Sequence, residues 1–223
     1  KLRTISSNII HHPERRSELR DALTCEIDFC VRGPRISVIY EHKYVVMIVV
    51  EDEYELRRLI ERRIKEQGPD CDLNDIDVRK VTDMSNMFRN TIFNGDISQW
   101  DVSNVTSMYG MFMNSKFNGD ISQWDVSHVR HMSWMFACSP FNGDISVWDV
   151  SKVEYMELMF VCSKFNGDIS EWTVGRVENM ISMFESSNFN GDLSKWDVSR
   201  VEYMDCMFLS SPLEGSEPSW YRD

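Results

Sequence analysis

Four aspartates recur with a period of 24 residues, and at one position of the series a threonine replaces the aspartate. They are Asp101, Asp125, Asp149 and Asp197, and the threonine is Thr173. If residues 24 apart lie on neighbouring parallel strands, their carboxylates stand about 4.8 Å apart and repel each other. A cation, a basic partner or hydrogen bonds to nearby backbone would relieve that repulsion. The spacing differs from that of the calcium-binding nonapeptide repeat, so the column predicts a solvated face that recruits a basic protein.

The residues two positions before these aspartates form a second column, that is, a set of equivalent positions in successive repeats. Their side chains differ in charge and polarity from one repeat to the next. Variation beside fixed columns is typical of a surface that recognises a partner, because the core constrains only the residues that face inward. We predict that the two columns form one exposed, acidic sheet face that binds another protein. Its residues are Gln99, Asp101, Gln123, Asp125, Val147, Asp149, Glu171, Thr173, Lys195 and Asp197.

Histidines offer little further chemistry. His128 and His131 are three residues apart within one repeat, but no third ligand stands in register with them, so no metal site is predicted. Catalysis needs dissimilar groups that converge, whereas the repeats copy the same few groups. Candidates that precede the repeats have no supporting spacing; they are His11, His12, Cys25, Cys30 and His42. We therefore predict neither an enzyme nor a cofactor.

None of the six cysteines forms a CxxC pair, and their scatter matches no zinc pattern. Cys138 and Cys162 are one repeat apart, so they should lie on adjacent coils, where a disulfide is geometrically conceivable. The favoured interpretation is small, buried thiols in a reducing compartment.

The repeat itself is the strongest pattern in the chain. The line FNGDISQWDVSNVTSMYGMFMNSK from Phe93 is followed by FNGDISQWDVSHVRHMSWMFACSP from Phe117. A fixed period of this length with apolar anchors predicts a stacked solenoid. Six tryptophans occupy one column and should be core: Trp100, Trp124, Trp148, Trp172, Trp196 and Trp220. The methionine columns should fill the interior as well.

Each coil should contain one short strand and one short helix. The strand should centre on Trp100 to Val102, since apolar residues alternate there. The helix should cover Val105 to Phe112, whose apolar residues fall at helical spacing, with Ser103 as its N-cap. The Asn94-Gly95 pair should turn the chain back toward the next coil with a positive φ.

The motifs FNGDIS, WDVS and VxxMxxMF resemble those of the BspA-like leucine-rich-repeat family, which includes mycoplasma surface lipoproteins. The resemblance covers residues 73–223. It implies a right-handed leucine-rich-repeat-like α/β solenoid over residues 71–223. Characterised proteins of this kind resemble adhesins or interaction modules.

Residues 1–70 are not repetitive and predict a small α+β unit of order αβββα. A helix from Pro13 to Leu23, three strands and a capping helix over residues 53–67 follow one another. This order is similar to that of a double-stranded-RNA-binding domain. Residues 51–55 are acidic, however, where such a domain carries a phosphate-binding lysine cluster, so RNA binding is not predicted.

Charge is distributed unevenly. Residues 1–70 hold equal numbers of basic and acidic side chains, so the net charge of −12 belongs to the repeats. Such a surface disfavours nucleic acid and anionic lipid, and no apolar run predicts membrane insertion or a signal peptide. The expected partner is a protein with a basic surface. A structural component of a cell surface or virion, which self-associates, is the alternative. An intracellular or virion-associated location is favoured over secretion.

Overall fold

The computed structural model describes residues 25–26, 37–38 and 47–222. Its elements are β1 (Cys25–Glu26), β2 (Ser37–Val38), β3 (Ile48–Val49), α1 (Glu53–Gln67) and β4 (Ile76–Asp77). β1 pairs antiparallel with β2, and β3 pairs parallel with β4. The helix predicted from Pro13 to Leu23 lies outside the described residues. So does most of the first two strands predicted in residues 1–70.

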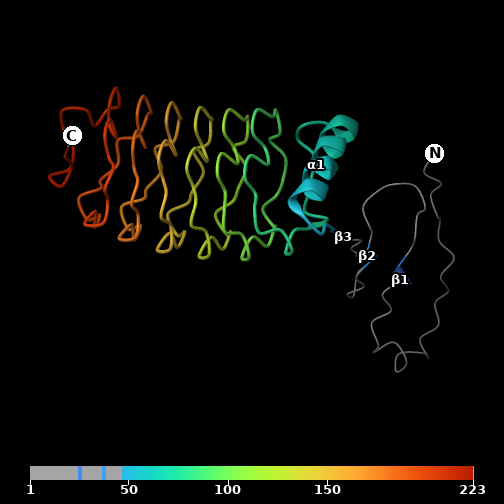
Figure 1. Ribbon diagram of the computed structural model, residues 1–223. Helices are drawn as coiled ribbons and strands as arrows, with labels where there is room; N and C mark the ends of the chain where they lie inside the picture. Colours follow the sequence, from blue (N-terminus) through green and yellow to red (C-terminus); the bar gives the residue numbers. More distant parts are fainter. Residues whose placement is uncertain (1–24, 27–36, 39–46, 223) are drawn as a thin grey trace, which may run out of the picture.

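Helix α1 covers the first turn of the repeats and occupies the residues that the sequence predicted. The Asp52 carboxylate accepts a hydrogen bond from the Glu55 N–H at 2.8 Å, which caps the helix N-terminus. Leu56, Leu59 and Ile60 are buried on the face toward the repeats. Figure 1 shows α1 standing across one end of the stack. The helix therefore shields apolar side chains that a terminal coil would otherwise expose.

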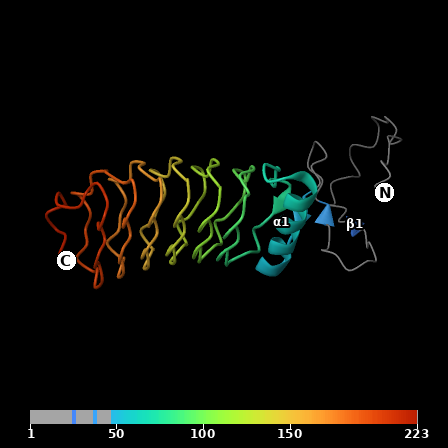
Figure 2. The ribbon, with the colours of Figure 1, turned by 90° about the horizontal axis from the view of Figure 1, so that it is seen from above.

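Beyond α1 the chain forms a row of coils of 24 residues (Figures 1 and 2). Equivalent residues of successive coils form parallel bridges, Asp83 with Ser107, Ser107 with His131, and so on to Asn179 with Tyr203. We call the eight residues that begin at each bridge a ladder segment. The ladder segments are 83–90, 107–114, 131–138, 155–162, 179–186 and 203–210.

The ladder segments correct the predicted helix. In residues 108–114 every second N–H donates to the carbonyl of the following coil, as from Met108 to His131 and from Phe112 to Met135, both at 2.9 Å. Gly110 and Asn114 have φ values of 58° and 52°, which a helix does not allow. Among the described residues, no helix other than α1 is present. The apolar spacing does not distinguish a helix from this structure. A chain that alternates between right- and left-handed backbone conformations also buries residues three and four positions apart.

The predicted strand is also wrong. Residues 100–102 form no bridge, and the parallel pairing lies on the ladder segments instead. Trp100 is nevertheless buried, 4% exposed, and its indole Nε1 donates to the Leu73 carbonyl at 2.9 Å. Ser103 is not a helix N-cap, since its N–H donates to the Asp101 carboxylate. The alternating apolar pattern reflects burial in a turn, not pairing in a sheet.

The glycines of the Asn-Gly pairs are needed for space, not for a positive φ. Gly95, Gly119 and Gly143 are absent from the residues with positive φ. A Cβ on Gly119 would stand 2.8 Å from the ring of Phe117 two residues earlier, and the other copies are similar. Positive φ occurs on the ladder segments, in two columns that are filled almost entirely by residues other than glycine.

The interior is one continuous column of aromatic and sulfur-containing side chains. Phe112 stacks on Phe136 of the next coil with ring centroids 5.7 Å apart, and Trp100 on Trp124 at 6.4 Å. The methionines of the inner columns, such as Met108 and Met111, are buried, apart from Met204 in the last ladder segment. The prediction that the tryptophan and methionine columns form the core is confirmed, except that Met204 and Trp220 are only partly buried.

Candidate functional site

All ten residues of the predicted binding face are exposed, but they do not lie on a sheet. They occupy two consecutive turns of each coil, beside the buried tryptophan. Val147 is the most apolar of them and is 72% exposed. We call these ten residues the acid row.

The carboxylates of the acid row are held by their own turns. The Ser127 N–H donates to Asp125 at 3.0 Å and the Ser151 N–H to Asp149 at 3.0 Å. Side-chain and backbone hydrogen bonds from Ser151 hold the pKa of Asp149 below its usual range, and Ser127 does the same for Asp125. Both aspartates therefore stay ionised, and local hydrogen bonds relieve part of the repulsion along the column.

Two ion pairs reduce the charge at the ends of the acid row. Lys195 pairs with Glu171 of the preceding coil, so these two members neutralise each other. At the other end Arg79 pairs with Asp77, which occupies the aspartate column one coil before Asp101, at 2.6 Å. On the middle coils Lys152 lowers the pKa of both Asp125 and Asp149, so their charge is partly compensated as well.

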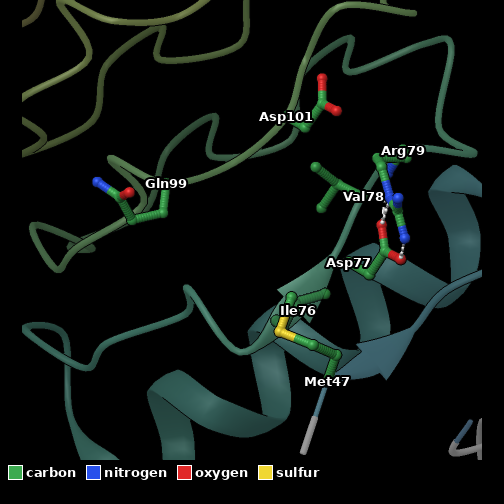
Figure 3. A pocket seen from close by; sticks show the side chains of 7 residues that line it. All are labelled: Met47, Ile76, Asp77, Val78, Arg79, Gln99 and Asp101. Carbon is green, nitrogen blue, oxygen red and sulfur yellow. Dashed lines mark hydrogen bonds and ion pairs between the residues drawn. The ribbon is translucent and has the colours of Figure 1, made fainter. Parts of the chain in front are cut away.

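A shallow hollow of about 280 Å³ lies where the acid row meets the strands next to α1. Its walls are Met47, Ile76, Asp77, Val78, Arg79, Gln99 and Asp101. Figure 3 shows the Arg79 guanidinium bonded to Asp77, so that this cation is already satisfied. Gln99 and Asp101 thus share a concave site, whereas the other eight residues of the acid row line neither this hollow nor a second one near the C-terminal coil.

The ladder segments present a second surface, which sequence reasoning missed. We call their outward side chains the ladder face. Its column at the bridges reads Asp83, Ser107, His131, Tyr155, Asn179 and Tyr203. The column two residues later reads Ser85, Tyr109, Ser133, Glu157, Ile181 and Asp205, of which Ser133 is buried. The next column reads Asn86, Gly110, Trp134, Leu158, Ser182 and Cys206, of which Gly110 and Ser182 are buried. No residue type dominates any of these three columns, whereas the inward columns of the same ladder segments scarcely change.

Aromatic rings contact one another across the middle of the ladder face. The His131 ring lies 5.4 Å from the Tyr109 ring and 5.2 Å from the Tyr155 ring, each on a neighbouring coil. Trp134 and Leu158 follow in the adjacent column and are partly exposed. We call Tyr109, His131, Trp134, Tyr155, Glu157 and Leu158 the central patch.

Three polar atoms in or beneath the central patch are buried and have no hydrogen-bond partner within the described part of the chain. They are His131 Nδ1, Ser133 Oγ and Glu157 Oε2. Buried polar atoms are nearly always paired, which makes these three unusual for the interior of a protein. Ser133 is fully buried, and the other two side chains are partly exposed.

The backbone of the central patch is strained at two bulky residues. Trp134 has φ 63° and Leu158 has φ 56°, where a glycine or an asparagine fits best. The same column carries Asn86 and Gly110, which adopt this conformation at lower cost. Strained backbone tends to persist where function requires the side chain.

Variation between repeats was the signal that could have identified the ladder face. The columns at Ser107 and Tyr109 vary between repeats as much as the column at Gln99 does. Within the described residues, no group of three His, Cys, Asp or Glu side chains could hold a metal ion. No helix there is long and apolar enough to cross a membrane.

A family of Mycoplasma proteins of unknown function, DUF285, matches residues 63–163 and 137–220. The two matches cover the coils and the end of α1 and leave residues 1–62 outside. No curated protein matches the chain. No solved structure matches it either.

Proposed function

Because the chain belongs to the DUF285 family, whose function is unknown, we propose a function from its surface. The protein is a non-catalytic interaction module, a leucine-rich-repeat-type solenoid of the BspA-like kind, and it binds a basic protein segment through the ladder face. The observation that carries the proposal is the contrast on that face: outward columns differ from coil to coil, whereas inward columns repeat. Core packing explains why the inward columns repeat, but it does not explain why the outward columns differ.

The composition of the central patch supports protein binding. Tyrosine and tryptophan dominate the energetic centres of protein interfaces, because they bury a large area at small entropic cost. Here three such rings, Tyr109, Trp134 and Tyr155, stand on three consecutive coils. Farther along the same face Tyr203 is 53% exposed and Leu209 is 44% exposed. The apolar surface thus extends along the stack, as an elongated partner would require.

Charge favours a basic partner. The ladder face carries four acidic side chains, Asp83, Glu157, Glu185 and Asp205, against the single cation Arg89. An arginine or lysine of the partner can lie over the aromatic rings and donate to Glu157. Glu157 is partly exposed, so a rotamer change brings its unpaired Oε2 to the surface. The acid row remains a second candidate surface for the same kind of partner.

Binding of a labelled oligoarginine peptide tests the proposal by fluorescence anisotropy. We expect Trp134→Gly with Tyr155→Ala to weaken binding roughly 30-fold, which corresponds to about 2 kcal/mol for an aromatic centre of an interface. Neither substitution changes the net charge, so a nonspecific attraction to an acidic protein would survive them. Glycine at Trp134 retains the positive φ, which protects the fold.

The matched variant lies in the acid row. Asp125→Lys with Asp149→Lys changes the charge of the protein outside the central patch. We expect a smaller loss of peptide affinity from this variant, and added salt should make that loss smaller still because it screens the charges. If this variant abolishes binding and the aromatic variant does not, the acid row is the site. If neither variant binds less tightly than the unmodified protein, neither the ladder face nor the acid row is the binding surface. Sedimentation at varied concentration separates binding from assembly, because an assembly component self-associates without the peptide.

A further inference from the structure

One column of the ladder segments brings equal side chains together on neighbouring coils. It is the last position of each segment, and it reads Asn90, Asn114, Cys138, Cys162, Ser186 and Ser210. Its side chains contact directly across the coils: Asn114 Nδ2 donates to Asn90 Oδ1 at 2.9 Å. The next pair along the column that consists of one residue type is Cys138 with Cys162.

The backbone holds these two cysteines in the same register as the asparagines. The Cys138 N–H donates to the Val161 carbonyl at 2.8 Å, and the Cys162 N–H to the Glu185 carbonyl at 2.9 Å. Each has φ 53°, so the two side chains leave the backbone in the same direction. Both thiols are free and exposed, and the prediction that these cysteines are buried is therefore wrong.

The two thiols also interact with each other. Although the Cys138 residue is exposed, partial desolvation of its thiol raises the pKa above its usual value, and the charge and hydrogen bonding of the adjacent Cys162 thiol raise it further. An effect of one thiol on the other requires that the sulfur atoms be close. Equivalent residues of neighbouring parallel strands lie about 4.8 Å apart, within the range of about 4.4–6.8 Å between Cα atoms that a disulfide spans.

We propose that Cys138 and Cys162 form a dithiol site that low-molecular-weight disulfides oxidise to a disulfide between the third and fourth ladder segments. This inference does not rest on the proposed function. In the first step the Cys162 thiolate attacks one sulfur of the small disulfide, forms a mixed disulfide and releases one small thiolate. In the second step the Cys138 thiolate attacks Cys162 Sγ, forms the Sγ–Sγ bond and releases the second small thiolate.

The electrons and protons balance in this exchange. The protein loses two electrons and the two thiol protons, and the small disulfide becomes two small thiols that take up those protons. Cys138 has the second role because its raised pKa disfavours its thiolate as the first attacking group. A disulfide here is exposed, and exposed disulfides are readily reduced again. The site is therefore reversible.

The disulfide would join the two coils that carry Trp134 and Leu158, each four residues before one of the cysteines. Covalent connection of adjacent coils opposes their separation, which is the first step when a stack of coils unfolds. Oxidation should thus raise the urea midpoint of the full chain.

Oxidation of the full chain with glutathione disulfide, alkylation of the remaining thiols and non-reducing peptide mapping test the proposal. We expect a peptide pair joined at Cys138 and Cys162 with the loss of two hydrogens, and a urea midpoint that rises on oxidation and returns on reduction. Cys162→Ser should abolish both changes. Cys206 is the internal control, because it is free and exposed but has Ser182 at the equivalent position one coil earlier.

A second, engineered pair keeps the test decisive if Cys162→Ser unfolds. Asn90→Cys with Asn114→Cys places thiols where the structure has side chains in contact, and it should cross-link under the same conditions. Separate glutathione adducts on Cys138 and Cys162, or alkylation of both after oxidation, would overturn the proposal. So would cross-linking of either residue to a different cysteine in preference to its neighbour.

Discussion

The indole Nε1 of Trp148 donates a hydrogen bond to the carbonyl oxygen of Ile121 in the preceding coil, at 3.2 Å. Trp148 is 4% exposed, so the same side chain fills the interior and satisfies a buried backbone carbonyl. Each member of the tryptophan column repeats this bond, the last one from Trp220 to Leu193 at 2.8 Å. The column therefore connects neighbouring coils by packing and by hydrogen bonding together.

Replacement of Trp148 with alanine should lower the free energy of unfolding by about 3–5 kcal/mol, because it leaves a cavity between two coils. Trp220→Ala should cost far less, since Trp220 is partly buried and packs on only one preceding coil. Trp148→Phe keeps one aromatic ring but removes the donor, and it should cost at least the roughly 1–3 kcal/mol of the unpaired carbonyl. Urea denaturation measures all three. Equal losses at Trp148 and Trp220 would contradict a stacked core.

The Asn-Gly glycines give a second prediction with a built-in control. In Gly143→Ala the new Cβ would lie 3.0 Å from the Phe141 ring, so that ring must move, and we expect a loss of about 1–3 kcal/mol. Gly95→Ala should be worse, because its Cβ would stand 1.9 Å from the Cys71 carbonyl oxygen. Gly175→Ala meets nothing closer than 3.5 Å and should gain about 0.4–1 kcal/mol. Thermal denaturation of the three variants should separate them in this order.

These glycines illustrate what a single sequence reveals. The period, the core columns and helix α1 follow directly from spacing and capping residues, because burial and helix caps leave local marks on the sequence. The reason for Gly143 does not, since it depends on where the Phe141 ring lies. Positive φ at Trp134 and Leu158 was equally unpredictable, because no local rule places bulky residues there.

The candidate site likewise has features that the sequence reveals and features that it does not. Exposure of Asp125 and its neighbours could be read from alternation with the buried tryptophans. The contact of His131 with Tyr109 and Tyr155 could not, because it depends on which part of each coil forms the ladder. A helix over Val105 to Phe112 would also stack equivalent residues, but it would not form the parallel bridges that bring these rings together.

Arg57 provides a test of the capping helix. Its guanidinium donates to the Asn86 carbonyl at 2.8 Å and to the Ser85 carbonyl at 3.0 Å, on the first ladder segment. Arg57→Ala leaves both carbonyls without these donors, and we expect a loss of about 1.5–3 kcal/mol, as for hydrogen bonds to charged groups. Arg58→Ala is the matched control because Arg58 is exposed. If the two variants are equally stable in urea, α1 does not stabilise the coils through Arg57.

Relief of strain at Leu158 should stabilise the fold at the cost of binding. Asparagine tolerates the positive φ, and the conformation costs a bulky residue about 1–2 kcal/mol. Part of that gain is offset because Leu158 is partly buried, so Leu158→Asn should raise the free energy of unfolding by less than about 1 kcal/mol. Ile181→Asn, at a partly exposed site with ordinary φ, should lower it. An unfolding midpoint that falls equally in both variants would show that Leu158 is not strained.

Asp149 should make the stability of the protein depend on pH in the acidic range. Hydrogen bonds from the Ser151 side chain and backbone lower the pKa of Asp149 below its usual 3.8 in the folded protein. A depressed pKa contributes stability that is fully present above the unfolded value and is lost as the pH falls through the folded value. Asp149→Asn keeps an acceptor oxygen for the Ser151 N–H but removes the titrating charge. The stability difference between the natural protein and this variant should therefore be constant near neutral pH and shrink below about pH 4.

Ser151→Ala separates the side-chain hydrogen bond from the backbone one. Without the hydroxyl, the pKa of Asp149 should rise toward 3.8, and the acid-induced loss of stability should begin at a higher pH than in the natural protein. Carboxyl titration by nuclear magnetic resonance measures the pKa, and urea denaturation at each pH measures the stability. If the pKa of Asp149 stays unchanged in Ser151→Ala, the backbone N–H alone holds this carboxylate. The serine that recurs after each aspartate of the acid row would then have another role.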